Sequence, residues 1–229
     1  STDAKDYRLR TSILIQYEGQ NIVVDSGPDF RYQMLKNKVD HLEALVFTHE
    51  HKDHTAGMDD VRAYNFIQRQ SVNIWASERV ERALRREFHY AFAETRYPGV
   101  PEITFHTIDG SPFKIGNLNL EPLEVMHHKL PVYGFKIKGF VYITDASMIP
   151  EATWEKMTGA EVLVLNALRK TEHISHFTLA EATQIAKDTA AKQTYLTHIS
   201  HQMGKHIDVE NELPQGVNLA YDGLVIELD

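Results

Sequence analysis

Short apolar runs separated by turn residues recur along the whole chain. Their lengths and boundaries are typical of β-strands, and longer amphipathic stretches follow several of them. Strands are predicted at residues 13–15, 22–24, 44–47, 103–105, 113–115, 118–125, 134–144 (two strands around Lys138-Gly139), 162–165 and 194–197. Helices are predicted at residues 57–68, 77–88, 150–157 and 178–191. Strands followed by helices in both halves predict an α/β (α+β) fold with two sheets and flanking helices.

Three local signals sharpen this pattern. The turn Glu18-Gly19-Gln20-Asn21 joins the first two apolar runs and predicts a β-hairpin. Thr178 followed by Glu181 is a capping box that starts the last predicted helix. Asp222-Gly223 between residues 217–220 and 224–228 predicts a second, terminal hairpin. Without repeats or linker-like stretches, we expect one domain over residues 1–229.

Composition excludes several classes of protein. The 229 residues are 42% hydrophobic and 24% charged, as in globular proteins, and the net charge is −8. This acidic balance argues against extended nucleic-acid binding, which depends on Lys and Arg. The absence of cysteine excludes a disulfide scaffold and a cysteine nucleophile. No run reaches the roughly 18 apolar residues of a membrane span, and no signal peptide opens the sequence, so we expect a cytoplasmic protein without membrane contacts.

The thirteen histidines are unusual and cluster. His49, His51, Asp53 and His54 form the motif H-x-H-x-D-H directly after the predicted strand 44–47. Alternate residues of an extended segment point to one side, so His49 and His51 can meet one metal ion. Asp53 and His54, at the turn into a helix, can face a second ion. Imidazole with carboxylate suits zinc and also manganese or iron.

Further candidate ligands follow other predicted strands. Each lies where an apolar run stops and a loop begins: His127 or His128, Asp145, and His198. Two metal sites need more ligands than the motif contains. A carboxylate such as Asp145 can bridge two cations with its two oxygens, which an imidazole cannot do. The strand-end placement therefore predicts a shared metal centre.

These motifs resemble those of the metallo-β-lactamase-fold hydrolases. The resemblance rests on H-x-H-x-D-H, the later His127, the strand-end Asp145 and the final Thr197-His198-Ile199-Ser200-His201. Within that superfamily, three details resemble the phosphoribosyl cyclic phosphodiesterase branch. They are His127-His128-Lys129-Leu130 before Gly134-Phe135, the run 197–201, and the terminal Asp222-Gly223. The resemblance implies a four-layer αββα sandwich of two mixed β-sheets flanked by helices.

The resemblance also implies residue roles. His49, His51 and His127 would hold one metal, and Asp53, His54 and His198 the other. Asp145 would bridge both, together with a water or hydroxide. Asp53, His176 and His201 would be catalytic, the two histidines as phosphate contacts or proton donors. Asp25, at the end of a predicted strand, would orient a ligand histidine.

The sequence departs from the family in two places. The family begins with a first strand and a Gly/Thr/Ser-rich loop, followed in this branch by cysteines that can hold a structural zinc. This sequence starts at Ser1, after that point, and has no cysteine, so no structural zinc is expected. Asn166 stands where the branch can carry an acidic residue, which bears on substrate identity.

The predicted function is that of a dinuclear metal-dependent hydrolase with two divalent ions per chain, Zn²⁺, Mn²⁺ or Fe²⁺. We expect a phosphodiesterase that cleaves a small or cyclic phosphodiester through a metal-bridging hydroxide. One alternative is a nuclease of the same fold that acts on DNA or RNA ends. A second is a metal-binding protein without catalytic activity. The expected partner is a small-molecule substrate, and homodimer formation stays open.

Overall fold

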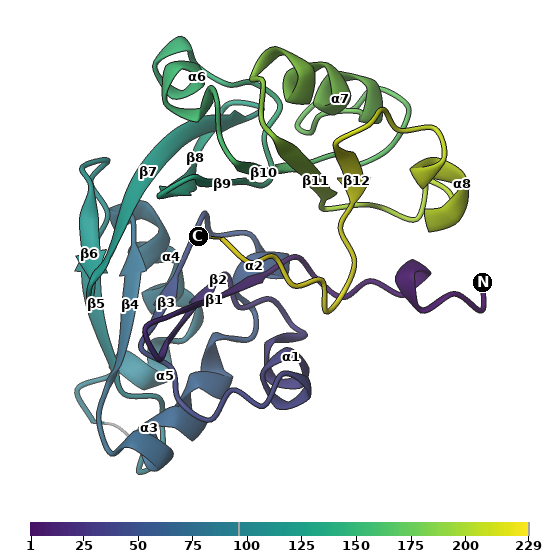
Figure 1. Cartoon of the computed structure of the whole chain (residues 1–229). Coiled ribbons are helices and arrows are strands. Elements are labelled where there is room, and N and C mark those ends of the chain that lie inside the picture. The colour runs from purple at the N-terminus through teal and green to yellow at the C-terminus, as the bar shows by residue number, and fades with distance from the viewer. Residues whose placement is uncertain (96, 229) are drawn as a thin grey trace. The chain divides into compact units, whose positions relative to one another are not determined.

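The computed structural model describes residues 1–95 and 97–228. The chain divides into two compact units, which we name by their main segments (Figure 1). The N-terminal unit is Arg10–Leu118, and the C-terminal unit is Asn119–Asp229 together with Ser1–Leu9. Each unit has its own cluster of buried apolar side chains.

The N-terminal unit contains a five-stranded mixed sheet in the order β1-β2-β3-β4-β5. Its strands are β1 Ile13–Tyr17, β2 Gln20–Val24, β3 Ala44–Val46, β4 Val72–Ala76 and β5 Ile103–Thr107. β1 and β2 form the predicted antiparallel hairpin, and β2 to β5 pair in parallel. β6 (Phe113–Ile115) follows shortly before the boundary between the units.

The helices of this unit contribute apolar side chains to the same cluster as the sheet, except for the four-residue helix Lys52–Thr55, whose buried residues are His54 and Thr55. These helices are α1 Phe30–Lys36, α2 Lys52–Thr55, the 3-10 turn η2 Met58–Val61, α3 Arg62–Gln68, α4 Glu78–Glu87 and α5 His89–Phe92. In α4, Val80 and Leu84 are one turn apart and both are buried in the cluster, while its Arg and Glu residues remain outside. The Ser77 hydroxyl accepts a hydrogen bond from the Val80 amide and caps this helix, as predicted.

The C-terminal unit is also built on a mixed sheet, with strands in the order β12-β11-β10-β9-β8-β7. These strands are β7 Leu118–His127, β8 Leu130–Ile137, β9 Phe140–Ile143, β10 Val162–Asn166, β11 Gln193–Thr197 and β12 Val217–Leu219. β7, β8 and β9 pair antiparallel, whereas β9 to β12 pair in parallel. The helices are α6 Glu151–Met157, α7 Leu179–Asp188, α8 His206–Glu210 and the 3-10 turn η1 Ala4–Asp6.

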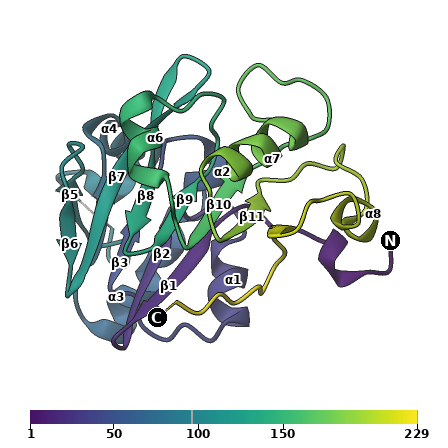
Figure 2. The same ribbon diagram turned by 45° about the horizontal axis from the view of Figure 1, so that its top comes forward.

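Figure 2 shows α6 and α7 covering strands of this sheet. Met157 of α6 and Ala182 and Ala186 of α7 belong to one apolar cluster with the strands. The capping box of α7 is present: the Thr178 hydroxyl accepts from the Glu181 amide, and the Glu181 carboxylate accepts from the Thr178 amide. Two mixed sheets flanked by helices confirm the predicted fold class.

The predicted terminal hairpin is wrong. β12 pairs in parallel with β11, and residues 224–228 form no strand. Asp222 instead accepts a hydrogen bond from the Leu9 amide at 3.0 Å, and Val225 is 78% exposed. The turn at Asp222-Gly223 is present, but the segment before it, β12, pairs with β11 and not with residues 224–228. In the part of the chain described, no helix has both the length and the hydropathy of a bilayer span.

Candidate metal centre

Strand ends in the N-terminal unit bring the first candidate ligands together. β2 and β3 are parallel, with Val24 opposite Val46, so the residues that follow both strands lie at one edge of the sheet. The Asp25 amide donates to the Val46 carbonyl at 2.8 Å, directly beside the start of the histidine motif. Asp25 has a φ of 64°, a left-handed conformation that Asp adopts more readily than most residues. The backbone therefore turns its carboxylate toward the motif.

Asp25 fixes two of the motif histidines through a buried network. Its carboxylate accepts from the Thr48 amide at 2.9 Å and the Thr48 hydroxyl at 2.8 Å. It also lies 2.7 Å from His54 Nδ1. Because the Thr48 hydroxyl donates to Asp25, its oxygen can only accept from His49 Nδ1, 2.9 Å away. Both histidines thus carry their proton on Nδ1 and keep the Nε2 lone pair for another partner.

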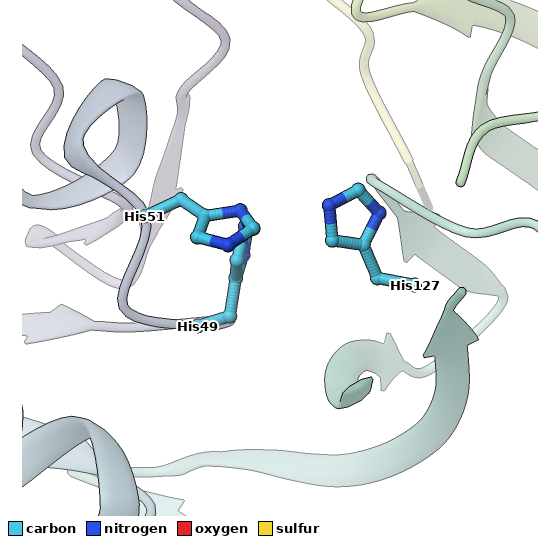
Figure 3. Close-up of side chains that lie close together, drawn as sticks. All are labelled: His49, His51 and His127. Carbon is cyan, nitrogen blue, oxygen red and sulfur yellow. The ribbon is translucent and has the colours of Figure 1, made fainter. Parts of the chain in front are cut away.

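The Nε2 atoms face other candidate ligands. His49 Nε2 lies 3.1 Å from His51 Nδ1, with the two rings meeting nearly edge to face (Figure 3). His54 Nε2 lies 3.6 Å from an Asp53 carboxylate oxygen. Two nitrogens held about 2.0–2.1 Å from one tetrahedral zinc lie about 3.3 Å apart. The His49–His51 spacing therefore suits ligands of one ion. We call Asp25, Thr48, His49, His51, Asp53 and His54 the first half-site.

Glycine permits the close approach of two loops behind this half-site. The Ser26 amide donates to the His54 carbonyl, and the Gly57 amide donates to the Ser26 carbonyl, each at 2.8 Å. A Cβ at Gly27 would lie 2.2 Å from the Asp53 carbonyl oxygen. Any side chain there would force the motif loop away from Asp25. The predicted helix 57–68 begins as the 3-10 turn Met58–Val61 and becomes α-helical at Arg62.

The C-terminal unit brings its candidates to one sheet edge in the same way. β9, β10 and β11 are parallel, and two antiparallel pairings give β7 the same direction as β9. His127 ends β7, Asp145 follows β9 and His198 follows β11. Asp145 and His198 have φ values of 55° and 53°. Left-handed non-glycine residues cost about 1–3 kcal/mol and gather at functional sites.

These side chains form a second buried cluster. His127, shown in Figure 3, has its Nδ1 2.8 Å from the Ser175 carbonyl oxygen, so Nδ1 carries the proton and Nε2 is the candidate ligand atom. His198 Nε2 lies 3.3 Å from Asp145 Oδ1, a spacing that suits ligands of one ion. His176 Nδ1 lies 3.6 Å from the same oxygen. We call His127, Asp145, His176 and His198 the second half-site.

His176 occupies the centre of the second half-site. Its ring stacks on His198 at 4.9 Å between centroids and lies 4.7 Å from the His127 ring. Burial lowers the pKa of His176 to about 3, an effect that the Asp145 carboxylate opposes. The imidazole is therefore neutral at neutral pH. Its Nδ1 is buried without a hydrogen-bond partner among the described residues.

Asn166 has a role that sequence reasoning missed. Its side chain is buried, accepts from the Ala146 amide at 2.8 Å and donates to the Ala146 carbonyl at 2.9 Å. This two-bond clamp fixes the residue that follows Asp145. Thr48 and Ser175, also missed, set the proton positions of His49 and His127. Asn166 directly follows a predicted strand of apolar residues, as Asp145 follows another. A polar residue in that position was the sequence signal for a role near the site.

Two sequence candidates are exposed and belong to none of the candidate metal-binding groups among the described residues. His128 is exposed in the turn after β7, with its amide bonded to the Ser147 hydroxyl. His201 is exposed in the turn after β11 and has no hydrogen bond among the described residues. His127 and His176, in contrast, are buried beside Asp145.

The donors present fit divalent metal ions. Ligand atoms of His127, Asp145 and His176 all lie within 4.8 Å of one another. Both half-sites combine imidazole with carboxylate, and the Nδ1 atoms of His49, His54 and His127 are held by protein acceptors. Such outer contacts are the usual support of metal-binding histidines.

Comparison with known proteins agrees with this chemistry. The family model described as a beta-lactamase superfamily domain matches residues 20–199, well over half of the chain. A solved structure described as a new diphosphatase from the PhnP family is 36% identical, with a TM-score of 0.93, covering 100% of this chain and 88% of that one.

Two curated relatives carry other names. An octanoyltransferase from Porphyromonas gingivalis is 34% identical over 232 residues, which cover 100% of this chain but only 47% of that protein. This chain thus spans less than half of that relative. A ribonuclease Z from Pyrobaculum islandicum is 23% identical over 241 residues, covering 85% of this chain and 82% of that protein. The chain belongs to the beta-lactamase superfamily and has the fold of its metal-dependent hydrolases.

Proposed function

We propose that the chain is a dinuclear metal-dependent phosphodiesterase. In this proposal His49, His51 and His127 hold one divalent ion, and Asp53, His54 and His198 hold the other. Asp145 is shared by both. The observation that carries the proposal is the metal-like spacing of paired ligand atoms, 3.1 Å between His49 Nε2 and His51 Nδ1 and 3.3 Å between His198 Nε2 and Asp145 Oδ1.

Neither half-site contains enough ligands for two closed metal sites. The first supplies three imidazoles and one ligand carboxylate, because Asp25 is already engaged by Thr48 and His54. The second supplies His127, His198 and Asp145, with His176 as a further donor. In the proposed assignment each ion would have three protein ligands and the shared Asp145 carboxylate. A fifth coordination position would then remain for water or substrate, as in catalytic sites that expand to five ligands.

Two bound divalent ions activate water and stabilise negative charge on a phosphoryl oxygen. The protein's own residues have distinct tasks. Asp25 and Thr48 hold the ligand histidines in the required tautomer. His176 is the proposed proton donor to the leaving oxygen. Burial lowers its pKa to about 3, so this role would require the negative charge of a bound substrate to stabilise the protonated imidazole.

A small phosphodiester or a diphosphate is the substrate class we favour. The solved relative at 36% identity is described as a diphosphatase, and the net charge of −8 disfavours a long polyanion. The ribonuclease Z relative favours the second candidate, cleavage at RNA ends. Acyl transfer is not proposed, because the octanoyltransferase extends over a similar length beyond the matched part.

A substrate panel tests the proposal. Protein stripped with chelator and reloaded with Zn²⁺, Mn²⁺ or Fe²⁺ is assayed on bis(p-nitrophenyl) phosphate, a cyclic ribose phosphate, a dinucleoside diphosphate and a short RNA. We expect metal-dependent turnover of the small esters and little cleavage of RNA. Efficient cleavage of RNA alone would support the nuclease instead. No turnover with any metal, in protein that binds two ions, would contradict an enzymatic function.

A further inference from the structure

The segment that follows Asp145 contacts the backbone on both sides of His127. Ser147, two residues after Asp145, is half-buried. Its hydroxyl accepts from the His128 amide at 2.9 Å and donates to the Met126 carbonyl at 3.1 Å. A serine hydroxyl has one hydrogen to donate and two lone pairs that accept, so one side chain can serve both groups. Ser147 therefore binds the backbone around one candidate ligand from the loop that carries another.

Backbone hydrogen bonds join the same two segments on one side of His127. The Met126 amide donates to the Met148 carbonyl at 2.9 Å, and the Met126 carbonyl accepts from the Ser147 amide at 2.8 Å. These bonds hold the residue before His127. The Ser147 hydroxyl adds the residue after it, His128, which has a left-handed φ of 57°. The backbone of His127 is thus fixed from both directions only with the help of this side chain.

Strand pairing does not set the separation of His127 and Asp145. The strands that precede or contain them, β9 and β7, are not neighbours in the sheet, because β8 lies between them. The bonds from Ser147 connect the ends of these two strands. The adjacent Ala146 is in turn clamped by the Asn166 side chain. The separation of the two candidate ligands therefore depends on a short segment that is itself fixed.

We propose that Ser147 is a positioning residue that sets the separation of His127 and Asp145 for metal binding. This rests on the ligand assignment of the proposed function, in which His127 holds one ion and Asp145 is shared by both. The candidate ligand atoms of the two residues lie within 4.8 Å of one another. Ligands held in place before the ion arrives lose less conformational freedom on binding, which raises affinity. Without the hydroxyl, the end of β7 can move relative to Asp145, and metal affinity falls.

Zinc competition tests the proposal. Protein loaded with Zn²⁺ is titrated with a chromogenic chelator, which measures affinity without turnover. Ser147→Ala should lower the affinity for at least one ion about tenfold, as removal of outer contacts of metal ligands does. Ser147→Thr keeps the hydroxyl and should bind zinc nearly as tightly as the wild type. In Ser147→Ala the His128 amide should also exchange its hydrogen with solvent about tenfold faster, because it has lost its acceptor.

The matched control is Thr153→Val. The Thr153 hydroxyl donates to the Glu124 carbonyl of β7 at 2.6 Å, so this variant also removes a side-chain hydrogen bond to that strand, but away from His127. It should lower the urea midpoint of unfolding and leave zinc affinity unchanged. Equal losses of affinity in Thr153→Val and Ser147→Ala would indicate a general weakening of β7 and overturn the positioning role.

Two further outcomes separate this role from the proposed function. A wild type that binds two zinc ions, with Ser147→Ala binding them equally tightly, would overturn the positioning role and leave the proposed function intact. A wild type that binds no zinc after loading would contradict the ligand assignment of the proposed function, and the positioning role would fall with it.

Discussion

The orientation and tautomer of the site residues are set by hydrogen bonds in the folded protein, which the sequence does not reveal. The histidine motif and the strand-end Asp145 can be found from residue type and spacing. The tautomers of His49 and His127 cannot, because they depend on Thr48 and on a carbonyl 48 residues away in sequence. The clamp of Asn166 on Ala146 likewise joins the end of β10 to the loop that follows β9. Sequence spacing identifies donors, and tertiary hydrogen bonds decide which atom each donor presents.

Asp145 and Asp25 should respond differently to removal. Asp145→Ala removes the proposed shared ligand, so binding of the second metal equivalent and turnover should both be lost. Asp25→Ala leaves the Thr48 amide and His54 Nδ1 buried without their acceptor. It should lower metal affinity about 10–100-fold and the free energy of unfolding by about 1–3 kcal/mol. Metal titration and urea unfolding measure both quantities. Retention of two ions and near-normal turnover in Asp145→Ala would refute the bridging role.

His176→Ala should separate proton donation from metal binding. The seven proposed ligands remain, so metal content should be unchanged. Loss of a general acid costs about 10²–10⁴ in rate, but only where the leaving group needs a proton. Nitrophenyl diesters should therefore be affected little and alkyl or ribosyl diesters strongly. Equal losses on both would indicate a phosphate-binding role, and loss of an ion would make His176 a ligand.

At the scale of elements, most strands and the longer helices follow from the apolar pattern. The hairpin β1–β2, helix α4 with its Ser77 cap and helix α7 with its capping box are all present where the local sequence signals predict them. The failures are strand β4, which no predicted strand covers, short helices such as α1 and α8, of seven and five residues, and the terminal hairpin. Short helices give too few turns for a periodic pattern. The segment after Asp222-Gly223 contains apolar residues, which favour a hairpin. β12 pairs with β11 instead, and such long-range pairing is not encoded in the local pattern.

Helix α4 supports the metal motif through its charged face. Arg79 donates to the Glu50 carboxylate at 3.0 and 3.3 Å, and Lys52 pairs with Glu87 at 2.5 Å. Glu50 and Lys52 are the intervening residues of the motif, so its non-ligand side chains are held by α4. The buried Val80 and Leu84 fix α4 itself on the core.

Charge exchange tests this support. Glu50→Arg and Arg79→Glu should each weaken metal affinity about 3- to 10-fold, less than loss of a group that bonds a ligand directly. The double variant should recover part of the loss because the ion pair is restored with reversed polarity. Lys52→Gln, which breaks a more exposed pair, serves as the control and should change affinity little. Additive losses in the double variant would exclude the coupling.

At the scale of the whole molecule, pH is expected to act through buried neutral histidines. His206 lies 3.0 Å from the Arg8 guanidinium, which can only donate, so His206 Nδ1 must accept. Burial lowers the pKa of His206, with Arg8 and Lys5 adding to the effect and Glu210 and Asp3 opposing it. The unfolded chain binds a proton at His206 below its ordinary pKa of 6.5, but the folded chain does not. Stability is therefore present above pH about 6.5 and is lost as the pH falls below it.

His206→Gln should flatten this dependence. Between pH 7.5 and 5.5 its free energy of unfolding should fall less than that of the wild type, because the glutamine amide does not titrate. His89→Gln is the matched control, since His89 is exposed, and it should follow the wild-type curve. Urea unfolding at a series of pH values, at fixed metal concentration, gives the comparison. Parallel curves for the wild type and His206→Gln would show that His206 does not couple stability to pH.

The metal stoichiometry tests the central claim most directly. Elemental analysis of the full chain, purified without chelator and then reloaded with Zn²⁺ or Mn²⁺, should find two equivalents per chain. Alanine variants in either half-site, His51→Ala or His198→Ala, should each lose at least one equivalent. A stoichiometry that stays at one after reloading, or a His198→Ala variant that keeps both ions, would contradict the proposed ligand assignment.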